Sequence, residues 1–138
     1  MFGSPAPIVR VANVRASLDY YTKVLGFSLN WDDGGMVSVS RDACTLFLCE
    51  WDQGQSGTWA WLGVRDCDAL HEELVGRGAR GRHPPTNFPW AYEMQVEDLD
   101  RNVLRLGSSS KKGEPYGQFL DAKGVFWDTE AGNPKRQR

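Results

Sequence analysis

The stretch that decides the fold is Ser17-Leu18-Asp19-Tyr20-Tyr21-Thr22-Lys23-Val24-Leu25-Gly26-Phe27. Its apolar residues recur at helical spacing, which predicts an amphipathic helix over residues 15–25. Gly26 follows as a natural end to that helix, because glycine adopts the left-handed conformation of a helix C-terminus at little cost. The run Ile8-Val9-Arg10-Val11 lies just before the helix and predicts a strand over residues 6–12.

Three more strands are predicted directly after this helix, over residues 27–32, 36–40 and 44–51. Asp-Asp-Gly-Gly separates the first two and Arg-Asp separates the second pair, and both are turn-forming sequences. Residues 5–51 therefore read as one β-α-β-β-β unit.

The same order of elements recurs over residues 58–107. A helix is predicted over residues 66–77, with Asp66 or Asp68 as its cap and Gly78 as its end. Strands are predicted over residues 58–64, 90–96 and 102–106. We therefore predict an α+β fold of two β-α-β-β-β units that share a plan and almost no sequence identity.

The segment His83-Pro84-Pro85-Thr86-Asn87-Phe88-Pro89 is predicted to be a loop, because it is rich in proline. Two roles are open for it. It is either a lid that closes over a ligand or a crossover held in place by Phe88 and Trp90.

The chain changes character at Ser108-Ser109-Ser110-Lys111-Lys112-Gly113. We expect residues 1–107 to form one domain and residues 108–138 to form a partly flexible C-terminal extension. Within the extension, residues 116–121 suggest a short turn or helix that docks by its aromatic side chains, and residues 133–138 suggest a frayed end.

Composition limits the function classes. The 138 residues are 41% hydrophobic and 25% charged, as in an ordinary globular domain. A net charge of only −2 argues against nucleic acid as a partner. No apolar run is long enough to cross a membrane, and the N-terminus lacks a secretory signal pattern. Three cysteines without CxxC spacing indicate reduced thiols, which favours a cytoplasmic protein.

Four motifs together resemble those of the vicinal oxygen chelate superfamily, which contains glyoxalases, extradiol dioxygenases and bleomycin resistance proteins. The motifs are residues 17–27, 45–48, 59–65 and the turn Asp98-Leu99-Asp100-Arg101-Asn102. The first three lean toward the bleomycin resistance proteins. The turn departs from the family pattern, since Leu99 replaces a proline and Arg101 replaces a glycine, which is the residue suited to a positive φ.

The resemblance implies a curved, cup-like mixed sheet with its helices on the convex side, often in a homodimer with swapped halves. Enzymes of the superfamily place metal ligands on the concave face, at positions that correspond here to Ala6, Phe47, Trp59 and Arg105. None of these side chains binds a divalent cation. We therefore predict no metal and no cofactor.

Strand periodicity extends these positions to a predicted concave face. Cys49 lies on the same face as Phe47, Trp61 lies on the same face as Trp59, and the other candidates are Arg10, Arg105, Trp31, Trp51 and Trp90. The aromatic side chains either line a ligand site or simply fill the cup. The two arginines are either exposed, paired with Glu93 or Glu50, or placed to bind a ligand carboxylate. Cys49 is the one candidate nucleophile, and a packing role is favoured because no histidine is placed to activate it.

These residues favour a binding protein over an enzyme. The resemblance implies sequestration of an antibiotic or another planar aromatic ligand in a groove where Trp59, Trp61 and Phe47 stack on it. The two arginines argue against cationic bleomycin and favour a neutral or anionic ligand. The alternatives are a metal-dependent lyase or dioxygenase of the same superfamily, which the missing ligands disfavour, and a dimerisation domain whose cup is filled.

Overall fold

The computed structural model describes residues 1–130 and 133–136. It contains two four-stranded mixed sheets, one from each half of the chain, and a three-stranded sheet formed by the C-terminal extension. The predicted α+β fold of two repeated units is confirmed.

The first unit begins with a short strand and a helix. These are β1 (Ile8–Arg10), the α-helix α1 (Val14–Asp19) and its π-helical continuation η1 (Tyr20–Val24). Three strands complete it: β2 (Ser28–Asp32), β3 (Met36–Arg41) and β4 (Cys44–Cys49). The sheet order is β1-β4-β3-β2, with β1 parallel to β4 and the other pairs antiparallel.

The predicted helix over residues 15–25 is present, with a widened last turn. Asn13 caps its start, since the Asn13 side chain accepts a hydrogen bond from the Ala16 N–H. The Leu25 N–H donates to the Tyr20 carbonyl at 3.1 Å, a bond one residue longer than in an α-helix. Both neighbouring tyrosines, Tyr20 and Tyr21, are buried on this turn.

The second unit repeats the plan. Its elements are β5 (Trp59–Gly63), α2 (Cys67–Gly76), β6 (Arg80–Asn87), β7 (Tyr92–Glu97) and β8 (Val103–Ser108). The order β5-β8-β7-β6, with β5 parallel to β8, reproduces that of the first unit. Asp66 caps α2 by accepting from the Ala69 N–H.

The expectation of a loop over residues 83–89 is wrong over most of its length. Pro84 and Pro85 lie inside β6, which pairs with β7 through register shifts on both sides of His83. The prolines are tolerated because β6 is an edge strand and the irregularities leave their missing N–H groups without a required partner.

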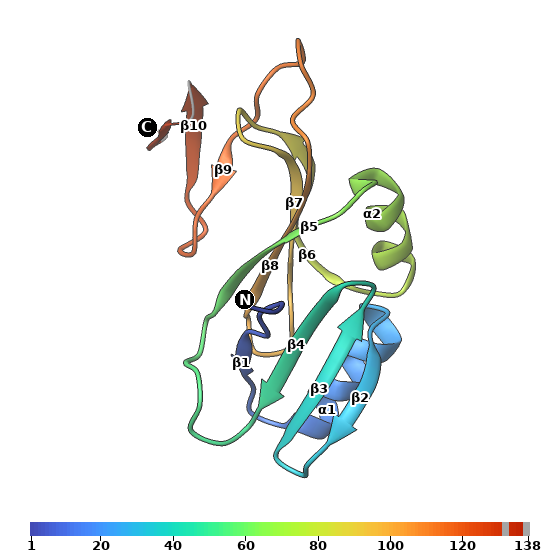
Figure 1. Cartoon of the computed structure of the whole chain (residues 1–138). Coiled ribbons are helices and arrows are strands. Elements are labelled where there is room, and N and C mark those ends of the chain that lie inside the picture. Colours follow the sequence, from blue (N-terminus) through green and yellow to red (C-terminus); the bar gives the residue numbers. More distant parts are fainter. Residues whose placement is uncertain (131–132, 137–138) are drawn as a thin grey trace.

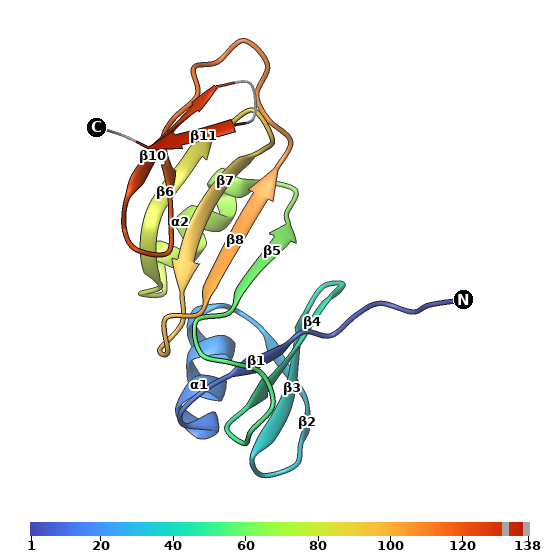
Figure 2. The ribbon, with the colours of Figure 1, turned by 90° about the vertical axis from the view of Figure 1, so that its left-hand side faces the viewer.

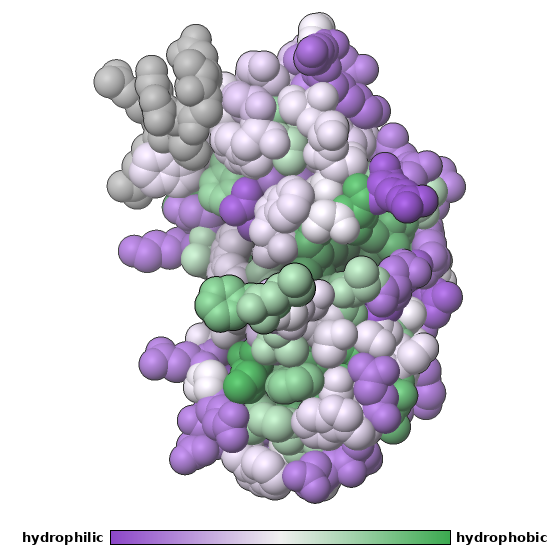
Figure 3. All heavy atoms as spheres, viewed as in Figure 1, coloured by the Kyte–Doolittle hydropathy of each residue, from purple (hydrophilic) through white to green (hydrophobic). Residues whose placement is uncertain are grey.

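Each helix packs on one face of its own sheet: in Figure 1, α1 lies behind the first sheet and α2 lies to the right of the second. Side chains that alternate toward the helices are buried in one continuous core, among them Leu46, Leu48, Leu104 and Leu106. In the space-filling view, hydrophobic side chains gather around the middle of the molecule and hydrophilic ones dominate its rim (Figure 3). The concave faces of both sheets are therefore turned away from the core.

Hydrogen bonds from the first helix join the two units. The Tyr20 hydroxyl donates to the Glu97 carbonyl at 2.7 Å, and the Tyr21 hydroxyl donates to the Asp98 carboxylate at 2.9 Å. Asp98 also organises the turn that follows it, because its carboxylate accepts from the Asn102 N–H and side-chain amide. Arg101, in the glycine position of that turn, has a φ of 63°.

The C-terminal extension forms β9 (Phe119–Leu120), β10 (Phe126–Glu130) and β11 (Asn133–Arg136), in the order β11-β10-β9. Residues 116–121 dock through the aromatic ring of Phe119 as expected, but as a loop and a strand rather than as a turn or helix. A strand occupies the first four residues of the segment expected to be frayed, and residues 137–138 lie outside the described residues. The extension lies in front of β6 and β7 when the concave side is viewed (Figure 2).

Neither α1 nor α2, nor any other helix of residues 1–130 and 133–136, has the length and apolar character that a bilayer crossing requires.

Candidate functional site

The predicted site residues lie on two concave faces rather than in one cup. Four belong to the second unit, where they surround β8: Trp59, Trp61, Trp90 and Arg105. Five belong to the first unit: Arg10, Trp31, Phe47, Cys49 and Trp51. Within the described residues, no strand of one four-stranded sheet pairs with a strand of the other.

A hollow of about 430 Å³ lies on the β5–β8 side of the second face. It is lined by Trp61, Gly63, Val64, Arg65, Trp90, Ala91, Gly107, Ser108 and Ser109. Trp61 is 50% exposed, and its ring lies over Gly107, where an added Cβ would come within 3.0 Å of Trp61 Cζ2. The glycine thus permits the indole to lie flat on the sheet, with one face free for a ligand.

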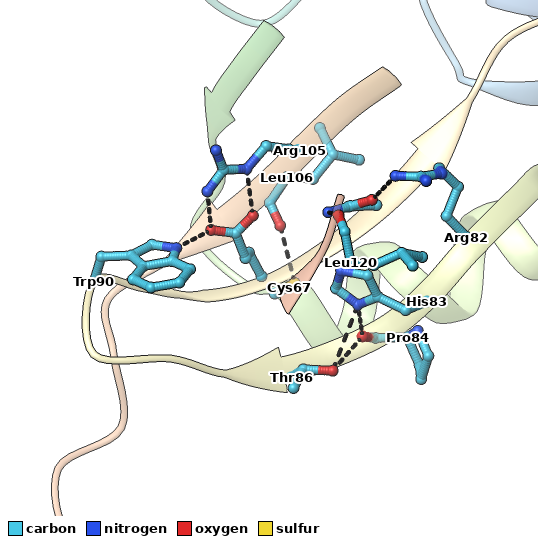
Figure 4. A network of polar contacts seen from close by, with 11 residues as sticks. Cys67, Arg82, His83, Pro84, Thr86, Trp90, Arg105, Leu106 and Leu120 are labelled. Carbon is cyan, nitrogen blue, oxygen red and sulfur yellow. Dashed lines mark hydrogen bonds and ion pairs between the residues drawn. The ribbon is translucent and has the colours of Figure 1, made fainter. Parts of the chain in front are cut away.

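Beside this hollow, a buried carboxylate holds two of the predicted residues. Glu93 is fully buried and accepts two hydrogen bonds from Arg105, at 2.8 Å from Nε and 2.9 Å from Nη2 (Figure 4). Its Oε1 also accepts from Trp90 Nε1 at 2.6 Å. Of the roles left open for Arg105, the structure shows the pairing with Glu93. The pair neutralises the charge of Arg105 and fixes the Trp90 ring in place.

The β6–β7 side of the same face is covered by the chain itself. We call residues 117–129 the C-terminal strap. Its Phe119 ring lies 5.8 Å from the Trp90 ring and 6.5 Å from the Trp59 ring, and the Arg105 guanidinium lies 5.1 Å from its centre. Phe88 completes the enclosure at 6.3 Å. Part of the predicted cup is therefore filled by a phenylalanine of the same chain.

Two polar side chains fasten the strap to the sheet. Gln95, which is fully buried, donates from Nε2 to the Leu120 carbonyl at 3.0 Å. Arg82 donates to the Gln95 side-chain oxygen and, from Nη2, to the Asp121 carbonyl at 2.6 Å. The Arg82 guanidinium also lies over the Trp59 ring at 5.2 Å, and burial lowers the pKa of Arg82.

Sequence reasoning did not identify Phe119, Arg82 or Gln95 as site residues. One signal pointed to Gln95: it stands two residues after Glu93, and alternation along β7 places both side chains on one face. The irregular pairing of β6 conceals Arg82, because it breaks that alternation.

The first concave face is open. Trp31 packs on Phe47 with ring centres 5.2 Å apart, and Trp31 remains 42% exposed. Trp51 is 47% exposed and lies against Gly35, where an added Cβ would overlap the indole. Neither tryptophan is a core residue.

The remaining two predicted residues of the first face differ from each other. Arg10 is half-buried, and its side chain makes no hydrogen bond or ion pair within residues 1–130 and 133–136. Cys49 is fully buried and offers a ligand no surface, in keeping with the packing role favoured for it.

The four positions implied for a family metal do not fit one. Phe47 is packed on Trp31, Trp59 faces the strap, and Arg105 is already paired with Glu93. Across the described part of the chain, no three histidine, cysteine, aspartate or glutamate side chains gather where they could hold a metal ion. The donor set that divalent metals require is missing from these residues.

The family is decided by a match over residues 5–106 to the model of the Glyoxalase/Bleomycin resistance protein/Dioxygenase superfamily. The chain belongs to this superfamily. The match spans both units and ends before the strap, so the strap lies outside the part of the superfamily fold that is matched. No curated protein matches the chain in sequence.

Solved structures agree with this membership. TnmS3, an antibiotic binding protein from Streptomyces sp. CB03234, is similar with a TM-score of 0.69 and 26% identity, over 80% of this chain and 99% of that one. A glyoxalase/bleomycin resistance protein from Streptomyces sp. CB03234 has a TM-score of 0.65 and 27% identity, over 75% and 99%. TioX from Micromonospora sp. ML1, at 16% identity, a TM-score of 0.67 and coverage of 77% and 98%, shares the fold.

Proposed function

We propose that this protein is a metal-free small-molecule binding protein of the bleomycin resistance type. It would sequester an antibiotic or another planar aromatic ligand on the concave face of its second unit. The observation that carries the proposal is the half-exposed Trp61 indole, which lies flat over Gly107 in an open hollow of about 430 Å³. An indole presented in this way offers a large, rigid surface on which an aromatic ring can stack.

Two further observations support this function. Trp90 borders the same hollow and is held by Glu93, so a second indole is already oriented before a ligand arrives. One similar solved structure, at 26% identity, is that of an antibiotic binding protein, and 99% of its chain is covered. The superfamily positions for metal carry alanine, phenylalanine, tryptophan and arginine, which makes a lyase or dioxygenase the weaker candidate.

The ligand groove is proposed to be completed in a homodimer in the cytoplasm. Trp31 and Trp51 of the first unit are too exposed for a core role and, with the half-buried Phe47 on which Trp31 packs, would supply the opposite wall from a second copy. Arg10 lies on that face without a carboxylate partner among the described residues, which suits a neutral or anionic ligand better than a cationic one.

The test is a titration that follows both tryptophan fluorescence and melting temperature. A bleomycin-group glycopeptide and a panel of planar aromatic antibiotics are added to the wild-type protein, to Trp61→Ala and to Tyr116→Ala. Tyr116 is the matched control because its ring is 52% exposed and lies outside the hollow.

Saturable quenching with a raised melting temperature is expected for at least one planar ligand, since a ligand that binds the folded state stabilises it. Trp61→Ala should weaken that binding about tenfold, the loss of roughly 1.4 kcal/mol of stacking, and Tyr116→Ala should leave it unchanged. Binding that is equal in both variants would refute the assignment of the hollow.

The second candidate is a dimerisation domain with a filled cup, and the position of Phe119 favours it. If the strap only fills space, no planar ligand will quench the tryptophans. Removal of Phe119 would then lower stability and expose no binding site.

A further inference from the structure

The strap covers the part of the second concave face that is richest in aromatic side chains. Its Phe119 ring is inserted among them as the ring of a ligand would be. Phe119 lies among Trp59, Phe88 and Trp90 with ring centres 5.8 to 6.5 Å away. The pairs with Phe88 and Trp90 are edge-to-face, at 68° and 70°. These are the distances and angles at which aromatic rings attract one another. The cage therefore accepts a planar ring.

The two arginines beside this aromatic cage differ in whether a carboxylate neutralises them. Arg105 is neutralised by Glu93, with which it forms two hydrogen bonds. Arg82 lies within 4.0 Å of no carboxylate among residues 1–130 and 133–136, and the acceptors of its hydrogen bonds are the neutral oxygens of the Gln95 side chain and of the Asp121 main chain. A half-buried guanidinium with neutral acceptors only is a strong site for a carboxylate, because charge-assisted bonds are about twice as strong as neutral ones.

We propose that the second concave face binds an aromatic acid, whose ring takes the place of Phe119 and whose carboxylate takes the place of the Asp121 carbonyl on Arg82. The strap is then a built-in competitor that leaves the face when the ligand binds. This inference rests on the proposed small-molecule binding function and names the chemical class of its ligand.

The spacing within the strap indicates the size of that acid. Phe119 begins β9 and Asp121 directly follows its end, and Cα atoms two residues apart on an extended chain are separated by about 6.5 Å. A carboxylate on a fused bicyclic ring, as in 2-naphthoate, spans a comparable distance from the centre of the far ring. The neutral 2-naphthamide has the same shape and lacks the charge, so the two compounds isolate the contribution of Arg82.

The strap should weaken the apparent affinity of such a ligand. A site that is open for only a fraction of the time binds with its intrinsic affinity reduced by that fraction. Phe119→Ala removes the ring that fills the cage and should raise the affinity for both compounds about tenfold, if the open state is about a tenth of the population. Phe126→Ala is the matched control, since Phe126 belongs to the neighbouring strand β10 and is 41% exposed.

Calorimetric titration of the full chain with each compound measures both effects. We expect 2-naphthoate to bind wild-type protein about tenfold more tightly than 2-naphthamide, and Arg82→Gln to reduce that ratio to about one. Arg82→Lys keeps the charge and should keep a preference for the acid. Arg80→Gln is the control, because Arg80 is exposed at the start of the same strand.

Hydrogen exchange at the strap amides supplies a second, independent readout. Bound 2-naphthoate should reduce the protection of residues 117–121, whose amides include the Gly117 N–H bonded to the Asn87 carbonyl. Retained protection in the complex would overturn the displacement of the strap.

Failure of this inference differs from failure of the proposed function. If neutral planar antibiotics bind in a Trp61-dependent manner while acid and amide bind wild type equally or not at all, the aromatic-acid site is refuted and the binding function stands. If no planar compound binds to wild type or to Phe119→Ala, both are refuted.

Discussion

The two concave faces belong to sheets with the same topology, but the polar side chains on them find their hydrogen-bond partners in different places. On the first face the buried Ser38 hydroxyl is satisfied within its own sheet, because it accepts from the Asn30 side-chain amide at 3.1 Å, and the Asn30 oxygen accepts in turn from the Ser40 hydroxyl at 3.0 Å. On the second face the buried Gln95 bonds to a carbonyl of the strap. The buried Ser38 of the first face is therefore satisfied without a covering segment, whereas the Gln95 amide of the second face depends on the strap for its acceptor.

This difference shows that side chains, and not the strand order, distinguish the two faces. The strands of both sheets pair in the same order, so the backbone does not distinguish the faces. On the first face, short hydroxyl and amide side chains satisfy one another by hydrogen bonds. The second face carries longer charged side chains instead: Glu93 and Arg105 pair with each other, and Arg82 bonds to the strap.

The largest expected effect concerns the buried ion pair of the second face. Glu93→Ala leaves Arg105 without its counter-ion and Trp90 without an acceptor, and it should lower the free energy of unfolding by about 4 kcal/mol. Phe47→Ala, at a half-buried position of the first face, should cost less than half as much. Urea denaturation of both variants measures the two losses. Equal losses of unfolding free energy would contradict the prediction that the buried ion pair of the second face contributes more to stability than Phe47 of the first.

The next effect concerns the hydrogen bonds that join the units. Tyr21→Phe removes a bond to the buried Asp98 carboxylate and should cost about 2 kcal/mol. Tyr20→Phe removes a bond to the neutral Glu97 carbonyl and also the acceptor of the Arg80 N–H, and the two neutral bonds together should cost about 2 kcal/mol as well. Far-ultraviolet circular dichroism during urea unfolding reports both values. If unfolding occurs in two steps and a variant shifts the urea midpoint of only one of them, the units unfold independently.

A stabilising substitution is expected in the turn before β8. Arg101 has a φ of 63°, so Arg101→Gly should raise the free energy of unfolding by about 1 kcal/mol. Asp42, in the turn before β4 of the first unit, has a φ of 50°. Asp42→Gly should gain less, because aspartate tolerates this region better than arginine does. Melting temperatures compare the two variants, and a larger gain at Asp42 would contradict the argument.

The smallest effect is a pH dependence of the strap. The Trp127 indole and the N–H groups of Val125 and Lys123 lower the pKa of Asp121 below its ordinary value of 3.8. A carboxyl whose pKa is lowered by folding stabilises the fold above its unfolded pKa, and that contribution is lost as the pH falls through the folded pKa. Acidification below 3.8 should therefore loosen the turn around Asp121.

The indole N–H resonance of Trp127 in two-dimensional NMR follows this titration. Asp121→Asn cannot titrate and should abolish the pH-dependent change in the resonance. In the first unit, Arg15 and the Gly34 N–H lower the pKa of Asp32 to about 2, so its turn provides an internal comparison. A Trp127 resonance that shifts alike in the wild type and Asp121→Asn would refute the role of Asp121.

Local sequence patterns were sufficient for most of the fold. The spacing of Leu18, Tyr21, Val24 and Leu25 predicted the first helix, and the residues that back each concave face alternate with those that line it. The Pro-rich edge strand was missed, because whether a proline breaks a strand depends on which side of it is paired. That information is not local.

The sequence by itself determined the repeated unit, the superfamily and the absence of metal-binding side chains at the four implied positions, since these depend on short-range spacing and on residue chemistry. Only the tertiary structure decided that Arg105 is neutralised by Glu93, that Arg82 has neutral acceptors, and that Phe119 lies in the aromatic cage. The Arg105–Glu93 pair joins β8 to β7, Arg82 lies on β6 where the pairing with β7 shifts in register, and Phe119 belongs to a strap that returns from beyond the repeat. Their geometry is set by the packing of the whole chain, and for that reason no local pattern contains it.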